Sequence, residues 1–131
     1  MSVIAIARTK SLVIGGLTAV ALATVATSAI AAAGEFAGIS LAVGGAPIPV
    51  SGFALLTVVF SLVGLVLALG LSRFARRPRT AFVRTTLVLT ALSLVPDVLA
   101  DAAGATKILL MLAHLVAATI VIPAIARRLA A

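Results

Sequence analysis

Six polar side chains in an otherwise aliphatic chain are of types that could do chemistry. They are Glu35, Ser93, Asp97, Asp101, Lys107 and His114. A histidine beside an aspartate resembles the base and its orienting partner in a catalytic triad, for which Ser93 would be the nearby nucleophile. A metal ion would need the imidazole together with two or three of the carboxylates. Because the chain has one histidine and no cysteine, we expect no metal and no other cofactor.

The same residues could instead bind a ligand or hold two helices together. Ionisable groups inside a membrane mark functional sites by default, so a site for a ligand or a lipid headgroup is one interpretation. A polar clasp that fixes the register of a helical hairpin is another, since interhelical polar contacts contribute about 0.6 kcal/mol on average. Neither interpretation makes the protein an enzyme, and we assign no catalytic residue.

Helical periodicity places two polar faces opposite each other in the C-terminal half. At about 100° per residue, one face holds Thr86, Thr90, Ser93, Asp97 and Asp101. The matching face of the next helix holds Lys107, Met111, His114 and Ala118. If the chain folds back at Gly104, Asp97 and His114 differ in depth by about 4–5 Å, at a rise of about 1.5 Å per residue. We therefore predict that Asp97 and His114 interact at the outer end of the bundle, directly or through one water.

The composition indicates which elements carry these residues. Hydrophobic residues make up 63% of the 131 positions and charged residues 10%, which is more apolar surface than a soluble domain of this length could bury. A membrane-spanning helix needs about 20 apolar residues. Four stretches are long enough: Ser11–Ala33, Phe53–Leu71, Ala81–Ala100 and Ile108–Ile125. The sequence predicts an all-α protein with a single transmembrane domain over residues 1–131, a four-helix bundle built from two helical hairpins.

The net charge of +7 is explained by a membrane rather than by nucleic acid. Eight of the ten basic residues precede the first stretch, lie between the second and third, or follow the fourth; Arg84 lies in the first turn of the third stretch on the same side, and only Lys107 lies on the other side. This positive-inside pattern places both termini in the cytoplasm, in a multi-pass protein of the plasma membrane. We expect no nucleic acid as a partner, but membrane lipids whose anionic headgroups contact the loop arginines. Those arginines are Arg73, Arg76, Arg77 and Arg79.

Three further features bear on the organisation of the chain. The N-terminal apolar run exceeds the usual length of about 7–15 residues in a signal peptide, so we expect a retained helix rather than a cleaved leader. The loop of residues 34–52 is rich in glycine and proline, and we expect it to cover the outer end of the bundle or to dip into the membrane interface. Small residues at four-residue spacing, such as Gly15, Ala19 and Ala23, favour close packing within the bundle. They also allow a homo-oligomer or a larger membrane complex.

Three segments of the chain resemble a known family. They are "PIPV" before the second apolar stretch, "RFARRPRTAFVRTTLVLTALSLVPD" across the inner loop and the third stretch, and "KILLMLAHLVAATIVIPAIARRL" near the C-terminus. They are similar to a family of small four-helix membrane proteins from high-GC bacteria, the domain of unknown function 6069. The resemblance covers essentially the whole chain, most clearly Pro47–Leu129. It implies four helices and a membrane location, and it supplies no activity and no site residues.

Three functions remain open on these observations. The first is an accessory protein or a binder of a lipid or other hydrophobic ligand, with its polar cluster at the outer end of the bundle. The second is a small proton-coupled transporter, in which transport is coupled to protonation of Asp97 or Glu35. The third is a membrane-embedded hydrolase that uses His114. We favour the first, because all three acids fall toward one side and no oxyanion donors are apparent.

Overall fold

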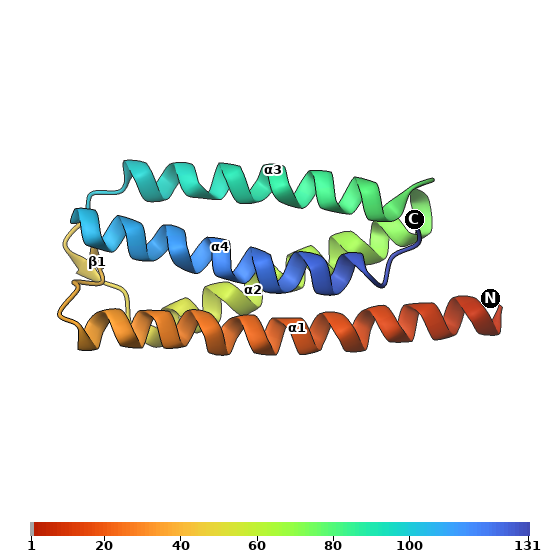
Figure 1. Ribbon diagram of the computed structural model, residues 1–131, viewed down its shortest axis with the longest axis horizontal. Helices are drawn as coiled ribbons and strands as arrows, with labels where there is room; N and C mark the ends of the chain where they lie inside the picture. Colours follow the sequence, from red (N-terminus) through yellow and green to blue (C-terminus); the bar gives the residue numbers. More distant parts are fainter. Residues whose placement is uncertain (1) are drawn as a thin grey trace.

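The computed structural model describes residues 2–131 as a bundle of four antiparallel helices with a short hairpin (Figure 1). The helices are α1 (Val3–Phe36), α2 (Val50–Phe74), α3 (Pro78–Leu99) and α4 (Gly104–Ala126). Strands β1 (Ala42–Val43) and β2 (Ala46–Pro47) pair antiparallel in the connection between α1 and α2. Both α1 and α3 pack against α2 and α4, so α1 and α3 lie on opposite sides of the bundle.

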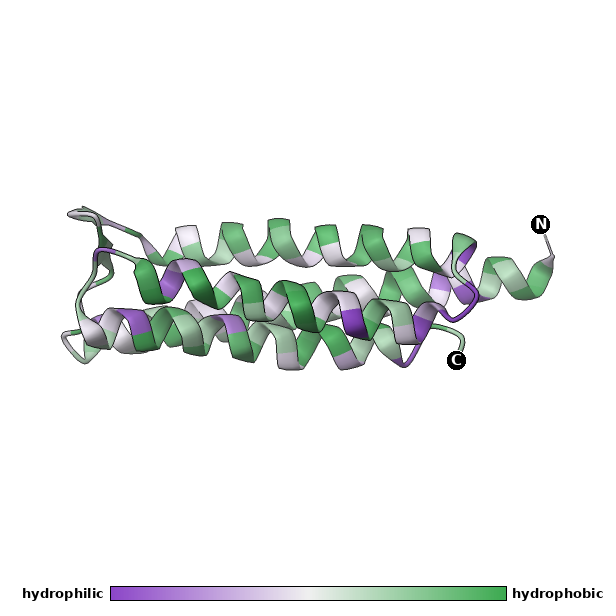
Figure 2. Ribbon diagram, turned by 90° about the horizontal axis from the view of Figure 1, so that it is seen from above, coloured by the Kyte–Doolittle hydropathy of each residue, from purple (hydrophilic) through white to green (hydrophobic). Residues whose placement is uncertain are grey.

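All four helices are long and apolar enough to cross a membrane, which confirms the predicted four-helix class. Large apolar side chains project from every helix to the outside of the bundle, where Figure 2 shows mostly hydrophobic ribbon. Examples are Leu22, Phe60, Val66, Leu87 and Ile108. This surface is compatible with hydrocarbon and not with water. The protein is therefore a multi-pass membrane protein.

Three of the four helices extend beyond both ends of the apolar stretches expected from the sequence, whereas α3 starts earlier and stops one residue short. The largest difference is in α1, which begins at Val3 rather than Ser11, where the Ser2 hydroxyl accepts a hydrogen bond from the amide of Ala5. With 34 residues, α1 is about 51 Å long, against a hydrocarbon core of about 30 Å. Its first turns accordingly project past the end of the bundle in Figure 1. Apolar length marks the part of a helix in lipid, while backbone hydrogen bonding continues into the polar flanks.

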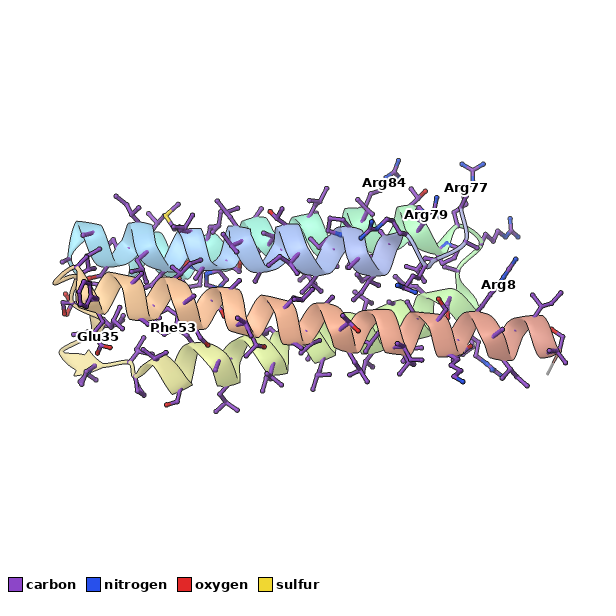
Figure 3. All side chains as sticks on the ribbon, turned by 60° about the horizontal axis from the view of Figure 1, so that its bottom comes forward. Arg8, Glu35, Phe53, Arg77, Arg79 and Arg84 are labelled. Atoms are coloured by element: carbon purple, nitrogen blue, oxygen red, sulfur yellow. The ribbon has the colours of Figure 1, made fainter. Side chains whose placement is uncertain are left out.

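The two ends of the bundle differ in charge. The basic end contains the start of α1, the junction of α2 and α3 and the C-terminus, and Arg8, Arg77, Arg79 and Arg84 gather there (Figure 3). The acidic end contains the end of α1, the hairpin and the turn between α3 and α4. All three acidic residues belong to this end or to the helix turn next to it.

Two clusters of buried side chains hold the helices together. The cluster toward the basic end includes Leu12, Leu65, Phe82 and Ile125. The cluster toward the acidic end includes Ala31, Leu41, Phe53, Leu109 and Ala113. Glycine allows the closest approaches, because a Cβ on Gly16 would overlap the side chain of Leu65 and one on Gly34 would overlap Leu109. Ala19 and Ala23 of the small-residue stripe expected from the sequence are also buried, so the stripe serves packing within the bundle.

The hairpin covers the acidic end, as the glycine and proline content of the loop predicted. Leu41 is buried in the second cluster, and Ile48 donates its backbone N–H to the carbonyl of Leu41. Positive φ angles at Gly44 (59°) and Gly45 (77°) allow the tight two-residue turn. The amide of Gly44 donates to the carbonyl of Asp101 at 2.8 Å, which ties the hairpin to the turn between α3 and α4.

Candidate functional site

Asp97 and His114 form the one ion pair among residues 2–131. The Oδ2 atom of Asp97 lies 2.7 Å from Nδ1 of His114, so the contact predicted from the two helical faces is formed directly. The Asp97 side chain is only 9% exposed, whereas the His114 side chain is 40% exposed. The carboxylate is thus enclosed between α3 and α4, and the imidazole reaches the surface of the bundle.

The antiparallel arrangement of α3 and α4 explains how the two side chains meet. Counting from the turn, His114 lies deeper in the bundle than Asp97 by about 4–5 Å. Side chains on an α-helix lean toward its N-terminus. Asp97 on α3 therefore leans toward the basic end, while His114 on α4 leans toward the acidic end. The two directions converge and close the difference in depth.

The hydrogen-bond geometry of the pair leaves the carboxylate of Asp97 with acceptor capacity to spare. Nδ1 of His114 lies 2.9 Å from the carbonyl oxygen of Leu110, one turn earlier on α4, in hydrogen-bonding geometry. Asp97 Oδ2 is closer to Nδ1, yet it has no partner that meets the angular requirements of a hydrogen bond. We treat the pair as a close electrostatic contact, because hydrogen-bond strength falls steeply with poor alignment. The buried carboxylate oxygen thus remains able to accept a better-aligned donor.

The structure brings together two of the six predicted site residues and places three others elsewhere at the acidic end. The ammonium of Lys107 donates to the carbonyl of Val98 at 2.9 Å rather than to a carboxylate. A cation at this position satisfies a terminal carbonyl of α3 and complements the helix dipole. Asp101 is exposed, and Glu35 is exposed beside the hairpin (Figure 3). Among residues 2–131, no three groups of metal-ligating type lie close enough to share an ion.

Ser93, the sixth residue, is bonded within its own helix. Its hydroxyl donates to the carbonyl of Thr90 at 2.6 Å. Thr90 and Thr86 likewise donate to carbonyls one turn earlier, each at 2.7 Å. Such bonds satisfy hydroxyls inside an apolar helix without a second helix. Within the described chain, therefore, the hydrogen bond between serine and histidine that a hydrolase would need is not formed.

A threonine pair between α1 and α2, with Thr27 buried and Thr57 half-buried, was not anticipated from the sequence. The hydroxyls of Thr27 and Thr57 lie 2.7 Å apart, and Thr27 is 2% exposed. Thr57 also donates to the carbonyl of Phe53. No sequence signal distinguishes these two threonines from the other helical threonines of the chain, because the contact depends on which helices are neighbours.

Arg79, expected from the sequence at lipid headgroups, also contacts the C-terminal segment. Its guanidinium donates to the carbonyls of Ala126 at 3.0 Å and Leu129 at 2.8 Å. Its backbone amide donates to the carbonyl of Ala130 at 3.1 Å. A cation here compensates the unpaired carbonyls at the end of α4. Arg73, Arg76 and Arg77 are exposed.

Comparison with known proteins identifies the family. The sequence profile of a family of unknown function, DUF6069, matches residues 7–131. The chain belongs to the DUF6069 family. This confirms the resemblance found in its segments, and the four apolar helices fit a small membrane protein. No curated protein and no solved structure matches the chain. A role for this DUF6069 protein therefore has to be argued from its own residues.

Proposed function

We propose that this protein binds a lipid-like molecule through the Asp97–His114 pair and has no catalytic activity. The polar part of the ligand would contact the imidazole and the carboxylate. Its apolar part would lie along the outside of α3 and α4. The protein would serve alone or as an accessory of a larger membrane complex.

The observation that carries this proposal is a buried carboxylate oxygen that keeps acceptor capacity beside an accessible imidazole. In a simple clasp, the N–H of the ring would point at the carboxylate and both groups would be satisfied. Here Nδ1 is in hydrogen-bonding geometry with Leu110, and Asp97 Oδ2 has no aligned donor. A carboxylate at the bilayer centre costs roughly 2.5–3.5 kcal/mol on insertion scales. A ligand hydroxyl or amine donating to Asp97 would offset part of that cost.

The surroundings of the pair favour a ligand with a large apolar part. Val98 on α3 and Leu115 on α4 are neighbours of the pair in sequence, and they expose 52% and 46% of their surface. A molecule reaching the imidazole from the membrane would cover apolar surface of this kind. A small hydrophilic solute would instead place its polar groups against the apolar side chains of Val98 and Leu115, which is unfavourable.

We further propose that the basic end faces the cytoplasm in the plasma membrane and that the acidic end faces outward. The positive-inside bias of nine basic residues in ten supports this orientation. Asp97 and His114 would then contact the outer leaflet. Asp97 is two residues from the end of α3, at a depth where the cost of a charged group is below its value at the bilayer centre.

The experiment is identification of co-purified lipids by mass spectrometry after extraction in a mild detergent. The wild type is compared with Asp97→Asn and His114→Gln, and with Glu35→Gln and Asp101→Asn as controls. The controls also remove a carboxylate at the acidic end, but both residues are exposed. We expect one lipid-like species to be enriched with the wild type and both controls and lost from the two pair variants.

A lipid profile that is the same for all five proteins would contradict the proposal and leave the pair as a structural clasp. Helix content by circular dichroism, together with elution volume, establishes that each variant is folded. A variant that loses both the species and the fold is replaced by His114→Asn, which shortens the side chain but keeps a polar group on α4.

A further inference from the structure

A groove runs between α1 and α4 at the basic end, on the outside of the bundle. It has a volume of about 390 Å³. Six residues that define its walls are Ile14, Thr18, Leu22, Thr119, Ile120 and Pro123. Most of this lining is apolar, and Ile14 and Leu22 are exposed. In a multi-pass protein such a surface contacts acyl chains.

A second hollow adjoins the groove and is lined by positive charge. Its volume is about 520 Å³, and its lining residues are Arg8, Ser11, Arg127 and Arg128. The two hollows share Arg127 and Arg128. An apolar groove therefore leads directly into a site with three guanidinium groups.

The three arginines have no carboxylate partner within residues 2–131. The acidic residues of the chain belong to the opposite end of the bundle, and the one ion pair there joins Asp97 to His114. Arg128 donates through one nitrogen to the hydroxyl of Ser11 at 2.8 Å and to its carbonyl at 3.3 Å. Arg127 donates through Nε to the carbonyl of Pro123 at 3.3 Å. Since a guanidinium has five N–H donors, both keep donors for an anion.

Gly15 determines the position of Arg128. A Cβ at Gly15 would overlap the guanidinium and Cδ of Arg128, so the arginine lies across α1 only because this residue has no side chain. The bond to Ser11 holds the side chain in that place. The charge of Arg128 is thus fixed at the mouth of the groove. Arg79 differs, because its guanidinium donates to two carbonyls of the C-terminal segment.

We propose that this groove is a binding site for one anionic glycerophospholipid. The phosphate lies among Arg8, Arg127 and Arg128, and one acyl chain lies along Ile14 and Leu22 between α1 and α4. Guanidinium groups bind phosphate through charge-assisted, bidentate hydrogen bonds. The site is at the opposite end of the bundle from Asp97 and His114, so it does not rest on the function proposed above.

Native mass spectrometry of the delipidated full-length protein in detergent tests the site. The probes are phosphatidylglycerol and phosphatidylcholine with the same acyl chains. We expect a single tight phosphatidylglycerol adduct. Arg127→Gln together with Arg128→Gln should weaken it by about tenfold or more, the scale of two lost charge-assisted hydrogen bonds. The matched control is Lys10→Gln with Arg84→Gln, which removes the same charge from exposed positions that line neither hollow and should change the affinity less than about twofold.

A second comparison tests the apolar groove. Thr18→Phe fills the groove on α1, and Thr85→Phe adds the same bulk to the exposed face of α3. We expect loss of the phosphatidylglycerol adduct from the first variant only. Glycerol phosphate without acyl chains should bind at least about a hundredfold more weakly than the lipid, since each buried methylene contributes to affinity. Asp97→Asn should bind phosphatidylglycerol like the wild type.

Three results would overturn the proposal. Equal weakening by the two double variants would mean that net charge alone attracts the lipid. Equal affinity for phosphatidylcholine would mean contact with bulk lipid only. Unchanged binding by Thr18→Phe would place the lipid outside the groove. If Arg127→Gln with Arg128→Gln does not fold, the lysine versions at both positions replace it, and a weaker, non-bidentate adduct is expected.

Discussion

The carboxylate of Asp97 and the imidazole of His114 are 2.7 Å apart, but only the carboxylate is enclosed. The contact joins α3 to α4 near the acidic end, where the two side chains lean toward each other along antiparallel helices. Because burial is unequal, removing one partner has a different consequence from removing the other. The exposed imidazole loses little when left alone, whereas the enclosed carboxylate loses its nearest polar partner.

His114→Gln is therefore expected to destabilise the protein more than Asp97→Asn. We expect His114→Gln, which leaves an unpaired carboxylate, to lower the free energy of unfolding by about 2–3 kcal/mol. Asp97→Asn should lower it by about 0.5–1 kcal/mol. Unfolding of purified protein in mixed micelles, followed by circular dichroism, measures both values and the double variant. A cycle in which the two effects simply add would contradict a direct interaction. Asp101→Asn, at an exposed carboxylate, should change stability little.

The threonine pair between α1 and α2 should be coupled in the same kind of cycle. Thr27→Val and Thr57→Val keep the shape of the side chain and remove the hydroxyls that lie 2.7 Å apart. We expect a coupling free energy of about 0.6 kcal/mol, the average for interhelical hydrogen bonds in membrane proteins. Thr119→Val is the control, because its hydroxyl bonds only to Leu115 one turn earlier. If the three valine variants lose the same free energy of unfolding, and the Thr27 and Thr57 variants show no coupling, the result would argue against the contact between Thr27 and Thr57.

Close packing at Gly16 should make even a methyl group costly. Gly16→Ala places a Cβ into the side chain of Leu65, which is itself buried and has little room to move. We expect a loss of about 1–3 kcal/mol in the unfolding free energy, as for other overpacked cores. Gly70→Ala is the matched change on α2, with no atom within 4 Å of the added Cβ. It should be neutral or stabilising by up to about 1 kcal/mol through helix propensity.

The proposed orientation predicts which loop is reached from outside the cell. In a chain without cysteine, Ser40→Cys in the hairpin segment and Ser72→Cys near the end of α2 provide single labels. Both positions are exposed. A membrane-impermeant maleimide added to intact cells should modify Ser40→Cys and spare Ser72→Cys until the cells are opened. The reverse labelling pattern would place the basic end outside.

Proton-coupled transport of organic cations is not expected. A carrier of that kind needs a carboxylate that water reaches alternately from both sides. All three acids belong to the acidic end, and the one enclosed carboxylate lies two residues from the end of α3. Proteoliposomes with an imposed pH gradient should show no more ethidium uptake than empty liposomes. Uptake that depends on the gradient and disappears in Asp97→Asn would overturn this expectation.

Several features of the protein follow from the sequence by itself. Apolar length determines the number of helices, because a backbone in hydrocarbon must satisfy its own hydrogen bonds. The family resemblance rests on contiguous segments and needs no coordinates. The contact between Asp97 and His114 was also predictable, since both residues lie on one hairpin with a short turn, and helix geometry then fixes their faces and depth. Helix ends were less predictable, because Ser2 caps α1 outside the apolar stretch.

Only the tertiary structure decided the contacts that depend on which elements become neighbours. The sequence predicts Lys107 in the polar cluster, but the turn brings its ammonium to the carbonyl of Val98 instead. The bonds of Thr27 to Thr57 and of Arg128 to Ser11 join segments whose adjacency no local pattern specifies. Polar groups in an apolar bundle bond to whatever partner packing places within about 3 Å. Packing is a property of the whole bundle, so these partners cannot be read from any single segment.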